Sequence, residues 1–254
     1  MHRRGWAVRG IVAAVIAGGW AGAAAAEPGL ANKVYEPYVK RGVTELELRG
    51  GRLNGGPLDG ESGLIVELEH GFSDRVSVAV LGEFERHAGE KSKLDAVAVE
   101  GVAYLGQIPR LGVDVGGYLE YEQRVHNESG VLEGKLLLAK QAGRFHGLLN
   151  LIVDRALTDR RGEDDTEFGY AAQGTFDAGR GVQLGLQAFG DLGTNRSFGG
   201  RQGHYLGPVA KWEVRPAWAK GELEFEAAYL LPVGATRGSA DNQLRFALEY
   251  ERRF

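Results

Sequence analysis

The chain has 254 residues, no cysteine, 40 glycines, 7 prolines and a formal net charge of −4 at pH 7. The lack of cysteine excludes disulfides, a cysteine metal site and a lipoprotein anchor. The excess of acidic residues argues against nucleic acid as a partner, because proteins that bind it carry a basic face.

The first 26 residues have the pattern of a secretory signal peptide. Arginines at positions 3, 4 and 9 precede the apolar stretch 11–17, and Ala24-Ala25-Ala26 ends the region. A positive region, a short apolar region and a small-residue cleavage site are the three parts of such a signal. A membrane-spanning helix needs roughly 20 strongly apolar residues, which this region lacks. We therefore expect a signal peptide over residues 1–26 and, after its loss, 27 basic against 34 acidic residues, a formal charge near −7.

A short polar stretch, residues 27–42, follows the signal peptide without strand alternation. We expect it to be either a periplasmic N-terminal lead or a plug folded inside a barrel. The rest of the chain, residues 43–254, alternates apolar and polar residues in segments of about nine to twelve residues, which indicates strands. Twelve strands are predicted, over residues 43–50, 61–70, 75–86, 93–105, 111–124, 131–142, 145–154, 166–177, 181–192, 204–214, 221–231 and 242–254.

The predicted connections alternate between long and short. Residues 51–60, 155–165, 193–203 and 232–241 form long polar loops, whereas residues 71–74, 106–110, 143–144 and 178–180 form tight turns. Bacterial outer-membrane barrels have long outer loops, short periplasmic turns and an even number of strands. A soluble periplasmic β-protein, the main alternative, has no reason to alternate its connections in this way.

The two faces of the predicted strands agree with a barrel. In the last strand Leu244, Phe246 and Leu248 share one face, while Gln243 and Arg245 share the other. Backbone groups in hydrocarbon must be paired internally, so such strands can span a bilayer only when closed. We therefore predict an all-β fold, a transmembrane antiparallel up-and-down barrel of about 12 strands in the outer membrane of a Gram-negative bacterium. The facing of the strand over residues 93–105 stays ambiguous, because Val97 and Val99 oppose Ala96, Ala98 and Glu100.

The end of the chain and one internal hairpin carry a family resemblance. Residues 244–254 resemble the C-terminal signal that barrel-assembly machinery recognises, with Phe246, Leu248, Tyr250 and Phe254 as its alternating apolar and aromatic positions. The hairpin 66–76, with the sequence VELEHGFSDRV, resembles outer-membrane barrels labelled as putative proteins of the meta pathway of phenol degradation. These resemblances imply a barrel, and the second implies a channel for small organic solutes; neither implies a catalytic residue.

Charged side chains gather on the predicted inner face, where acids outnumber bases. The candidates for lining the lumen are Glu45, Glu47, Glu67, Glu69, Glu83, Glu85, Glu120, Glu122, Glu133, Lys135, Glu222, Glu224, Glu226, Arg245, Glu249 and Glu251. A lumen rich in carboxylates repels anions and favours cations or neutral polar solutes. The same side chains would equally hydrate and cross-link a closed lumen, since a polar interior is expected in both cases.

No pattern supports catalysis. The sequence His126-Asn127-Glu128-Ser129 places a histidine near a serine, but in a predicted outer loop, and no Gly-x-Ser-x-Gly motif occurs. The histidines show no H-x-x-x-H or H-E-x-x-H spacing. We expect no enzyme, no cofactor and no metal site, with an outer-membrane lipid hydrolase as the least favoured alternative.

These patterns lead to two functional hypotheses. The first is a passive channel or uptake pore for small cationic or neutral solutes. The second is a structural or surface-interaction barrel whose lumen is filled by its own side chains. The expected partners are outer-membrane lipid, lipopolysaccharide near the charged loop 160–165, the barrel-assembly machinery and small solutes, with no nucleic acid.

Overall fold

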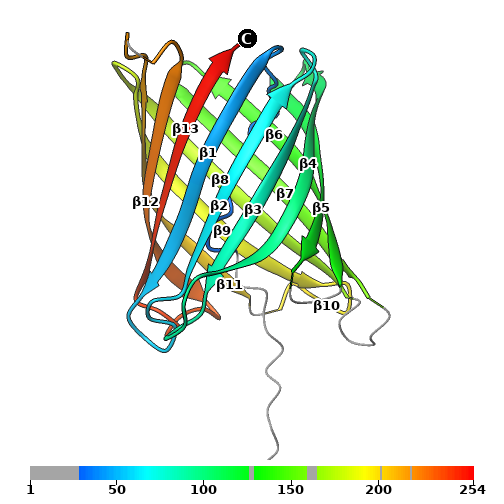
Figure 1. The fold of residues 1–254 in the computed structure, drawn as a ribbon, viewed down its shortest axis with the longest axis vertical. Coiled ribbons are helices and arrows are strands. Elements are labelled where there is room, and N and C mark those ends of the chain that lie inside the picture. Colours follow the sequence, from blue (N-terminus) through cyan, green and yellow to red (C-terminus); the bar gives the residue numbers. More distant parts are fainter. Residues whose placement is uncertain (1–28, 126–128, 159–164, 201, 218) are drawn as a thin grey trace, which may run out of the picture.

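The computed structural model describes residues 29–125, 129–158, 165–200, 202–217 and 219–254, so the predicted signal peptide lies outside the described residues. Within this part of the chain, one antiparallel sheet of twelve long strands closes into a barrel (Figure 1). The strands are β1 (Val43–Asn54), β2 (Ser62–Gly71), β3 (Val76–Arg86), β4 (Lys93–Ile108), β5 (Val113–Arg124), β6 (Gly130–Ala142), β7 (Phe145–Leu157), β8 (Thr166–Gly179), β9 (Val182–Thr194), β11 (Gly203–Val214), β12 (Glu222–Gly234) and β13 (Asn242–Arg253). A two-residue strand, β10 (Ser197–Phe198), pairs only with β9.

The first and last strands close the barrel. They pair without interruption from Val43 opposite Arg253 to Asn54 opposite Asn242. Each of the other long strands pairs with its neighbours in chain order, β9 with β11 included. No free edge is left to expose unpaired N–H and C=O groups, which is the condition for crossing a bilayer with strands. No helix among the described residues is long and apolar enough to cross a membrane.

The two ends of the barrel differ in the length of their connections. Two-residue turns at 143–144 and 180–181 lie at one end, together with the start of β1 and the end of β13. This is the upper end in Figure 1, where the C-terminus is marked, and we call it the turn end. The opposite loop end carries connections such as 55–61 and 235–241. The predicted alternation of long and short connections is confirmed except between β11 and β12, where residues 215–221 form a seven-residue connection at the turn end.

Several strands extend further toward the loop end than the sequence patterns predict. The sequence pattern predicts that the first strand ends at residue 50. In the structure β1 continues to Asn54, with Gly50 opposite Phe246 and Gly51 opposite Arg245. In the same way β7 runs to Leu157 and β12 runs through Pro232 to Gly234. The loops predicted at 51–60, 155–165 and 232–241 are therefore shorter than expected.

The outer face of the barrel is apolar. Large side chains that point away from the lumen remain exposed, among them Leu46 (50%), Val80 (52%) and Leu119 (60%). The ambiguous strand β4 follows the same rule, since Val97 (46%) and Val99 (52%) are exposed. Its alternate residues Ala96, Ala98 and Glu100 are buried, with exposures of 0%, 6% and 2%. Glu100 therefore lies on the inner face.

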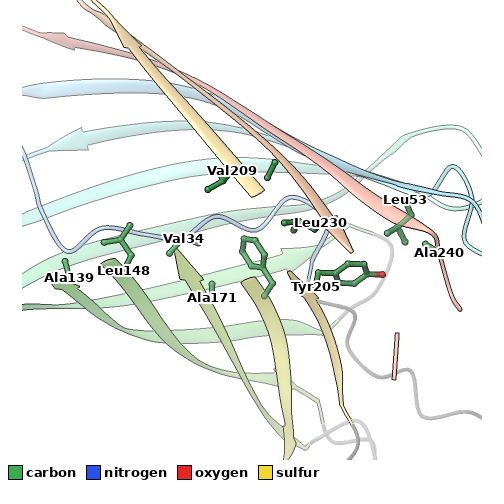
Figure 2. Close-up of a cluster of buried hydrophobic side chains, with 11 residues drawn as sticks. Val34, Leu53, Ala139, Leu148, Ala171, Tyr205, Val209, Leu230 and Ala240 are labelled. Atoms are coloured by element: carbon green, nitrogen blue, oxygen red, sulfur yellow. The ribbon is translucent and has the colours of Figure 1, made fainter. Parts of the chain in front are cut away.

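The interior also contains apolar side chains. Among the described residues they form three clusters, of which the largest is shown in Figure 2. Each cluster includes one residue from the stretch that precedes β1: Val34 in the largest, Ala31 in the second and Tyr35 in the third. This stretch, residues 29–42, is called the N-terminal segment below. It packs inside the barrel.

Glycines in the wall make room for the N-terminal segment. A Cβ atom on Gly51 would lie 2.1 Å from the carbonyl oxygen of Leu30, and one on Gly71 would lie 2.2 Å from that of Lys40. Gly71 ends β2, and Gly63, near the start of β2, also faces Leu30. The segment therefore runs beside almost the full length of β2, from the loop half of the barrel to the turn end.

Replacing Gly51 by alanine tests this close approach. The added methyl group would meet backbone, so we expect Gly51→Ala to lower the free energy of unfolding by about 1–3 kcal/mol, a typical cost of overpacking. The measurement is urea unfolding of the refolded barrel in lipid vesicles, followed by tryptophan fluorescence. Gly174→Ala is the matched control, because a Cβ atom there would meet nothing within 4 Å. Equal losses of unfolding free energy in the two variants would contradict the close packing of the segment against Gly51.

Candidate functional site: the barrel lumen

The main chain of Tyr35 is bound to the barrel wall by one buried amide. Asn150 on β7, 0% exposed, accepts from the Tyr35 N–H (2.7 Å) and donates to the Tyr35 carbonyl oxygen (2.9 Å). An asparagine side chain that pairs with both backbone groups of one residue replaces the partner strand that the N-terminal segment lacks. The segment is therefore fixed in position along the barrel at Tyr35.

The side chain of Tyr35 lies at the centre of a polar network. Its hydroxyl donates to Glu100 Oε2 (3.0 Å) and accepts from Arg49 Nη2 (3.3 Å). Its ring lies 4.7 Å from the ring of Tyr118, whose hydroxyl also donates to Glu100 Oε2 (2.8 Å). The ammonium of Lys135 lies 4.3 Å from the Tyr35 ring centroid and 4.1 Å from that of Tyr118, within the range of cation–π attraction. One residue of the segment thus contacts several strands of the wall.

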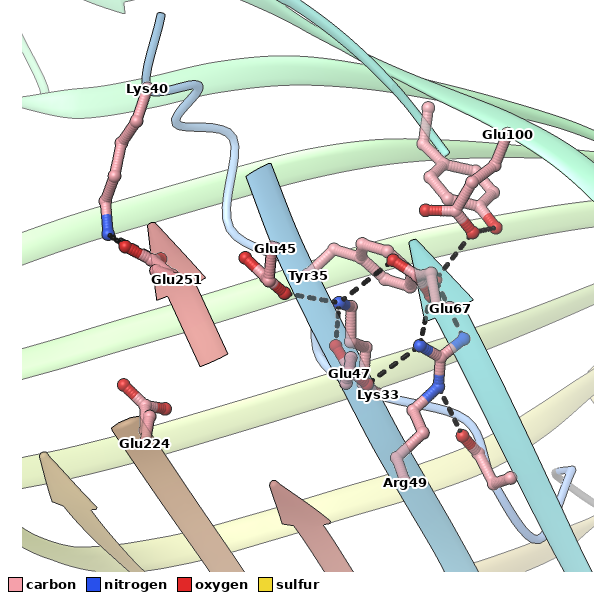
Figure 3. Close-up of polar contacts among 12 residues, drawn as sticks. Lys33, Tyr35, Lys40, Glu45, Glu47, Arg49, Glu67, Glu100, Glu224 and Glu251 are labelled. Atoms are coloured by element: carbon pink, nitrogen blue, oxygen red, sulfur yellow. Dashed lines mark hydrogen bonds and ion pairs between the residues drawn. The ribbon is translucent and has the colours of Figure 1, made fainter. Parts of the chain in front are cut away.

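Two cations bind the carboxylates of β1 and β2 around this tyrosine (Figure 3). Arg49, 4% exposed, donates to Glu47 (2.8 Å), to Glu67 and to the Ala31 carbonyl oxygen (2.9 Å). Lys33, from the N-terminal segment, bonds to Glu47 and lies 3.6 Å from Glu67. Buried charges are tolerated when they are paired and hydrogen-bonded in this way. The segment therefore supplies part of the positive charge that the wall lacks.

The sixteen residues predicted to line the lumen differ in burial. Glu47, Glu67, Lys135 and Arg245 are buried, and the other twelve, Glu45, Glu69, Glu83, Glu85, Glu120, Glu122, Glu133, Glu222, Glu224, Glu226, Glu249 and Glu251, are half-buried. The structure brings Glu45, Glu47 and Glu67 together around Lys33. Lys33, Tyr35 and Glu100 are not among the residues predicted from the sequence. The first two lie in a stretch without periodicity, and Glu100 lies on the strand whose facing was ambiguous.

A chamber of about 390 Å³ opens at the turn end, between the N-terminal segment and the opposite wall. Its acidic lining residues are Glu36, Asp177, Glu213, Glu222, Glu224 and Glu251. The lining also contains Lys40, Arg144 and His146. Lys40 is bound to Glu251 at 2.6 Å (Figure 3), and Arg144 lies over the Phe176 ring at 4.7 Å. Acidic groups therefore dominate the charge of the chamber.

The wall across from β1 and β2 is held by fewer ion pairs. Lys211 on β11 pairs with Glu224 on β12 at 2.5 Å, and Gln187 on β9 donates to Glu226 at 2.9 Å. Arg245 lies 4.0 Å above the ring of Phe189, in a cation–π contact. The first contact joins neighbouring strands, whereas the other two reach across one or two intervening strands of the wall.

Other sequence candidates lie apart from the lumen. Phe246 (46% exposed) and Phe254 (78%) belong to the resemblance with the assembly signal, with Leu248 and Tyr250 half-buried between them. Recognition by assembly machinery stays a prediction. His126, Asn127 and Glu128 lie outside the described residues, as does most of the charged loop 160–165.

The fold is that of known outer-membrane porins. No protein-family model and no curated protein sequence matches the chain. Among solved structures, the NanC porin aligns with a TM-score of 0.56 and 11% identity over 81% of this chain and 98% of its own. An outer membrane channel from Pseudomonas putida F1 aligns at 0.53 and 13%, over 90% and 99%. The KdgM porin in complex with oligogalacturonate aligns at 0.52 and 8%, over 83% and 99%. This chain thus has the architecture of a bacterial outer-membrane β-barrel.

Removing Arg49 tests the charged cluster. Because Arg49→Met leaves Glu47 and Glu67 short of a buried partner, we expect a loss of about 3–5 kcal/mol in the free energy of unfolding. The same vesicle-based urea titration measures it. Arg252→Met, on the exposed outer face at the turn end, is the control and should change stability by no more than about 0.5 kcal/mol. If the cluster does not stabilise the barrel, both variants will show the same small change in the free energy of unfolding.

Proposed function

We propose that this barrel is a passive outer-membrane channel for small cationic or neutral solutes, with the N-terminal segment narrowing its lumen. The observation that carries the proposal is the acid-lined chamber at the turn end. In an outer-membrane barrel the short turns face the periplasm, so the chamber forms the periplasmic mouth. Carboxylates around a narrow mouth concentrate cations and exclude anions.

The charges of the chamber support this selectivity. Lys40 is paired with Glu251. Glu213 and Glu222 pair with Arg215, and Glu224 pairs with Lys211. Arg215, the partner of Glu213 and Glu222, has a side chain that is 73% exposed and is therefore strongly hydrated and screened. Six acidic residues line the mouth against Lys40 and Arg144, so negative charge is in excess there.

The charge of the chamber argues against the kind of solute that KdgM was solved with. That porin was solved with oligogalacturonate, a polyanionic sugar. A chamber with an acidic excess disfavours such a solute by like-charge repulsion. Cationic and neutral molecules suit the chamber better. The resemblance of the hairpin 66–76 to barrels of phenol degradation favours small organic molecules among the neutral solutes.

A closed structural barrel is the second candidate, and the N-terminal segment is the observation that favours it. The segment contributes to each apolar cluster found in the described interior, and Tyr35 connects β1, β4, β5, β6 and β7. Residues 27–42 would then be a plug rather than a free lead. The two candidates differ in whether ions pass beside the seated segment. Neither includes a catalytic step.

Charge removal in the chamber tests the channel. The double variant Glu222→Gln/Glu224→Gln lowers the negative charge of the mouth, so we expect its cation preference to fall and the reversal potential in a KCl gradient to move toward zero. Planar-bilayer recording of the refolded protein measures this potential. Glu90→Gln, in a loop at the opposite end and paired with Lys93, is the control and should leave it unchanged. Wild-type protein without conductance would discard the channel.

Deleting residues 27–41 tests the role of the segment. The deletion removes the side chains that fill the lumen beside β2, so we expect single-channel conductance to rise several-fold. Heat-dependent gel mobility verifies that the deleted protein still forms a barrel. Unchanged conductance in a folded deletion variant would show that the segment does not limit the passage.

A further inference from the structure

Three carboxylates meet on the inner face beside the N-terminal segment. One oxygen from each of Glu67, Glu69 and Glu100 lies within 4.8 Å of the others. Strand register explains the approach, because Ala79 on β3 pairs with Glu69 on one side and with Glu100 on the other. The small alanine between the two acids lets their side chains converge. Carboxylates at this separation repel one another unless a cation or a proton lies between them.

Two of these carboxylates have one oxygen that accepts no hydrogen bond. Glu67 and Glu100 are 1% and 2% exposed, yet Glu67 Oε1 and Glu100 Oε1 have no hydrogen-bond partner. Their other oxygens are occupied, Glu67 Oε2 by Arg49 and Glu100 Oε2 by the hydroxyls of Tyr35 and Tyr118. Each carboxylate is thus oriented by one oxygen, while the second accepts no hydrogen bond; that of Glu67 has only an ion pair of 3.6 Å with Lys33. Outer-shell hydrogen bonds orient metal-binding carboxylates in the same way.

The neighbouring cations do not neutralise this cluster. Lys33 Nζ lies 3.6 Å from Glu67 Oε1, but it is bonded to Glu47 and lies 3.9 Å from Glu45. Arg49 is shared between Glu47 and Glu67. Burying a carboxylate without compensation costs several kcal/mol, so the cluster lacks positive charge.

We propose that Glu67, Glu69 and Glu100 form a binding site for a divalent cation of the hard, oxygen-preferring class, such as Ca²⁺. Three carboxylates supply anionic oxygen ligands of the type this class prefers, and water completes the coordination. The site lies where the wall meets the N-terminal segment, because Tyr35 orients Glu100. Cation binding therefore stabilises the seated segment. The inference goes beyond the channel proposal, since a closed barrel would bind the ion equally well.

The tyrosines beside Glu100 provide a direct readout. Tyr35 and Tyr118 hydroxyls lie 3.0 and 2.8 Å from Glu100 Oε2, close enough to sensitise luminescence of Tb³⁺, a hard cation that replaces Ca²⁺. Full-length barrel in detergent is stripped with chelator and titrated with Tb³⁺ under tyrosine excitation, and Ca²⁺ is then added to displace it. We expect a saturable signal that Ca²⁺ removes.

Three variants separate binding from folding. Glu69→Gln removes one ligand and leaves the contacts of Arg49 and Tyr35 intact; Tb³⁺ affinity should fall by about tenfold or more, since even outer-shell losses cost that much. Glu83→Gln, the same substitution on the inner face of β3, should leave affinity unchanged. Lys33→Gln should tighten binding, because it removes an ammonium that competes for Glu67; misfolding cannot produce a gain of this kind.

The proposal is overturned by any of three results in protein with native gel mobility. These are no saturable signal in the wild type, equal affinity in the wild type and Glu69→Gln, or an infrared band of a protonated carboxyl that disappears in Glu100→Gln without any Tb³⁺ binding. The last result would mean that a shared proton relieves the repulsion. Conductance is not part of this test, so failure of the channel proposal and failure of the cation site are distinguishable.

Discussion

The closure of β1 against β13 is the constraint on which the rest of this molecule depends. In hydrocarbon an unpaired N–H or C=O group costs several kcal/mol, so a sheet that spans a bilayer cannot have an edge. The unbroken register from Val43–Arg253 to Asn54–Asn242 removes the last edge. In the closed barrel, successive side chains of each strand face the lipid and the interior in turn. The apolar residues of the alternating pattern therefore lie on the outer face, and the acidic residues lie on the inner face. The inward position of the acidic residues on the strands follows from this separation.

Closure also creates an interior that the wall cannot fill by itself, and the N-terminal segment occupies part of it. The segment enters where the wall carries glycine in place of larger residues, at Gly51 and Gly71. Asn150 replaces a strand partner for its main chain, and Tyr35 places an aromatic ring among Arg49, Lys135 and Glu100. Packing and charge compensation are therefore achieved by the same few residues. A change that displaces the segment would expose apolar clusters and leave buried carboxylates short of partners at the same time.

Most of the barrel was predictable from sequence, because strand alternation is a local property. The number of long strands, their order and the inner facing of acids such as Glu47 and Glu67 follow from period-two patterns. The strand ends were less predictable: Gly50-Gly51 has the composition of a turn, but in the structure Gly51 makes room for Leu30 and Gly50 for the neighbouring strands. The facing of Glu100 was ambiguous because alanine and valine alternate around it, and alanine suits both faces. The position of Lys33 and Tyr35 depends on contacts with residues far away in the chain, which no local pattern contains.

The lumen retains more acid than its own packing requires. Where a charged group serves only to fill space, an apolar side chain of similar volume is often as stable or more stable. Here the three acids Glu45, Glu47 and Glu67 share two cations, Lys33 and Arg49, and acids also outnumber bases in the turn-end chamber. Two separate regions with the same excess of negative charge are difficult to explain by interior cross-linking, which would favour matched pairs. This excess fits the two proposals made above, a cation-selective mouth in the chamber and a cation site beside Tyr35.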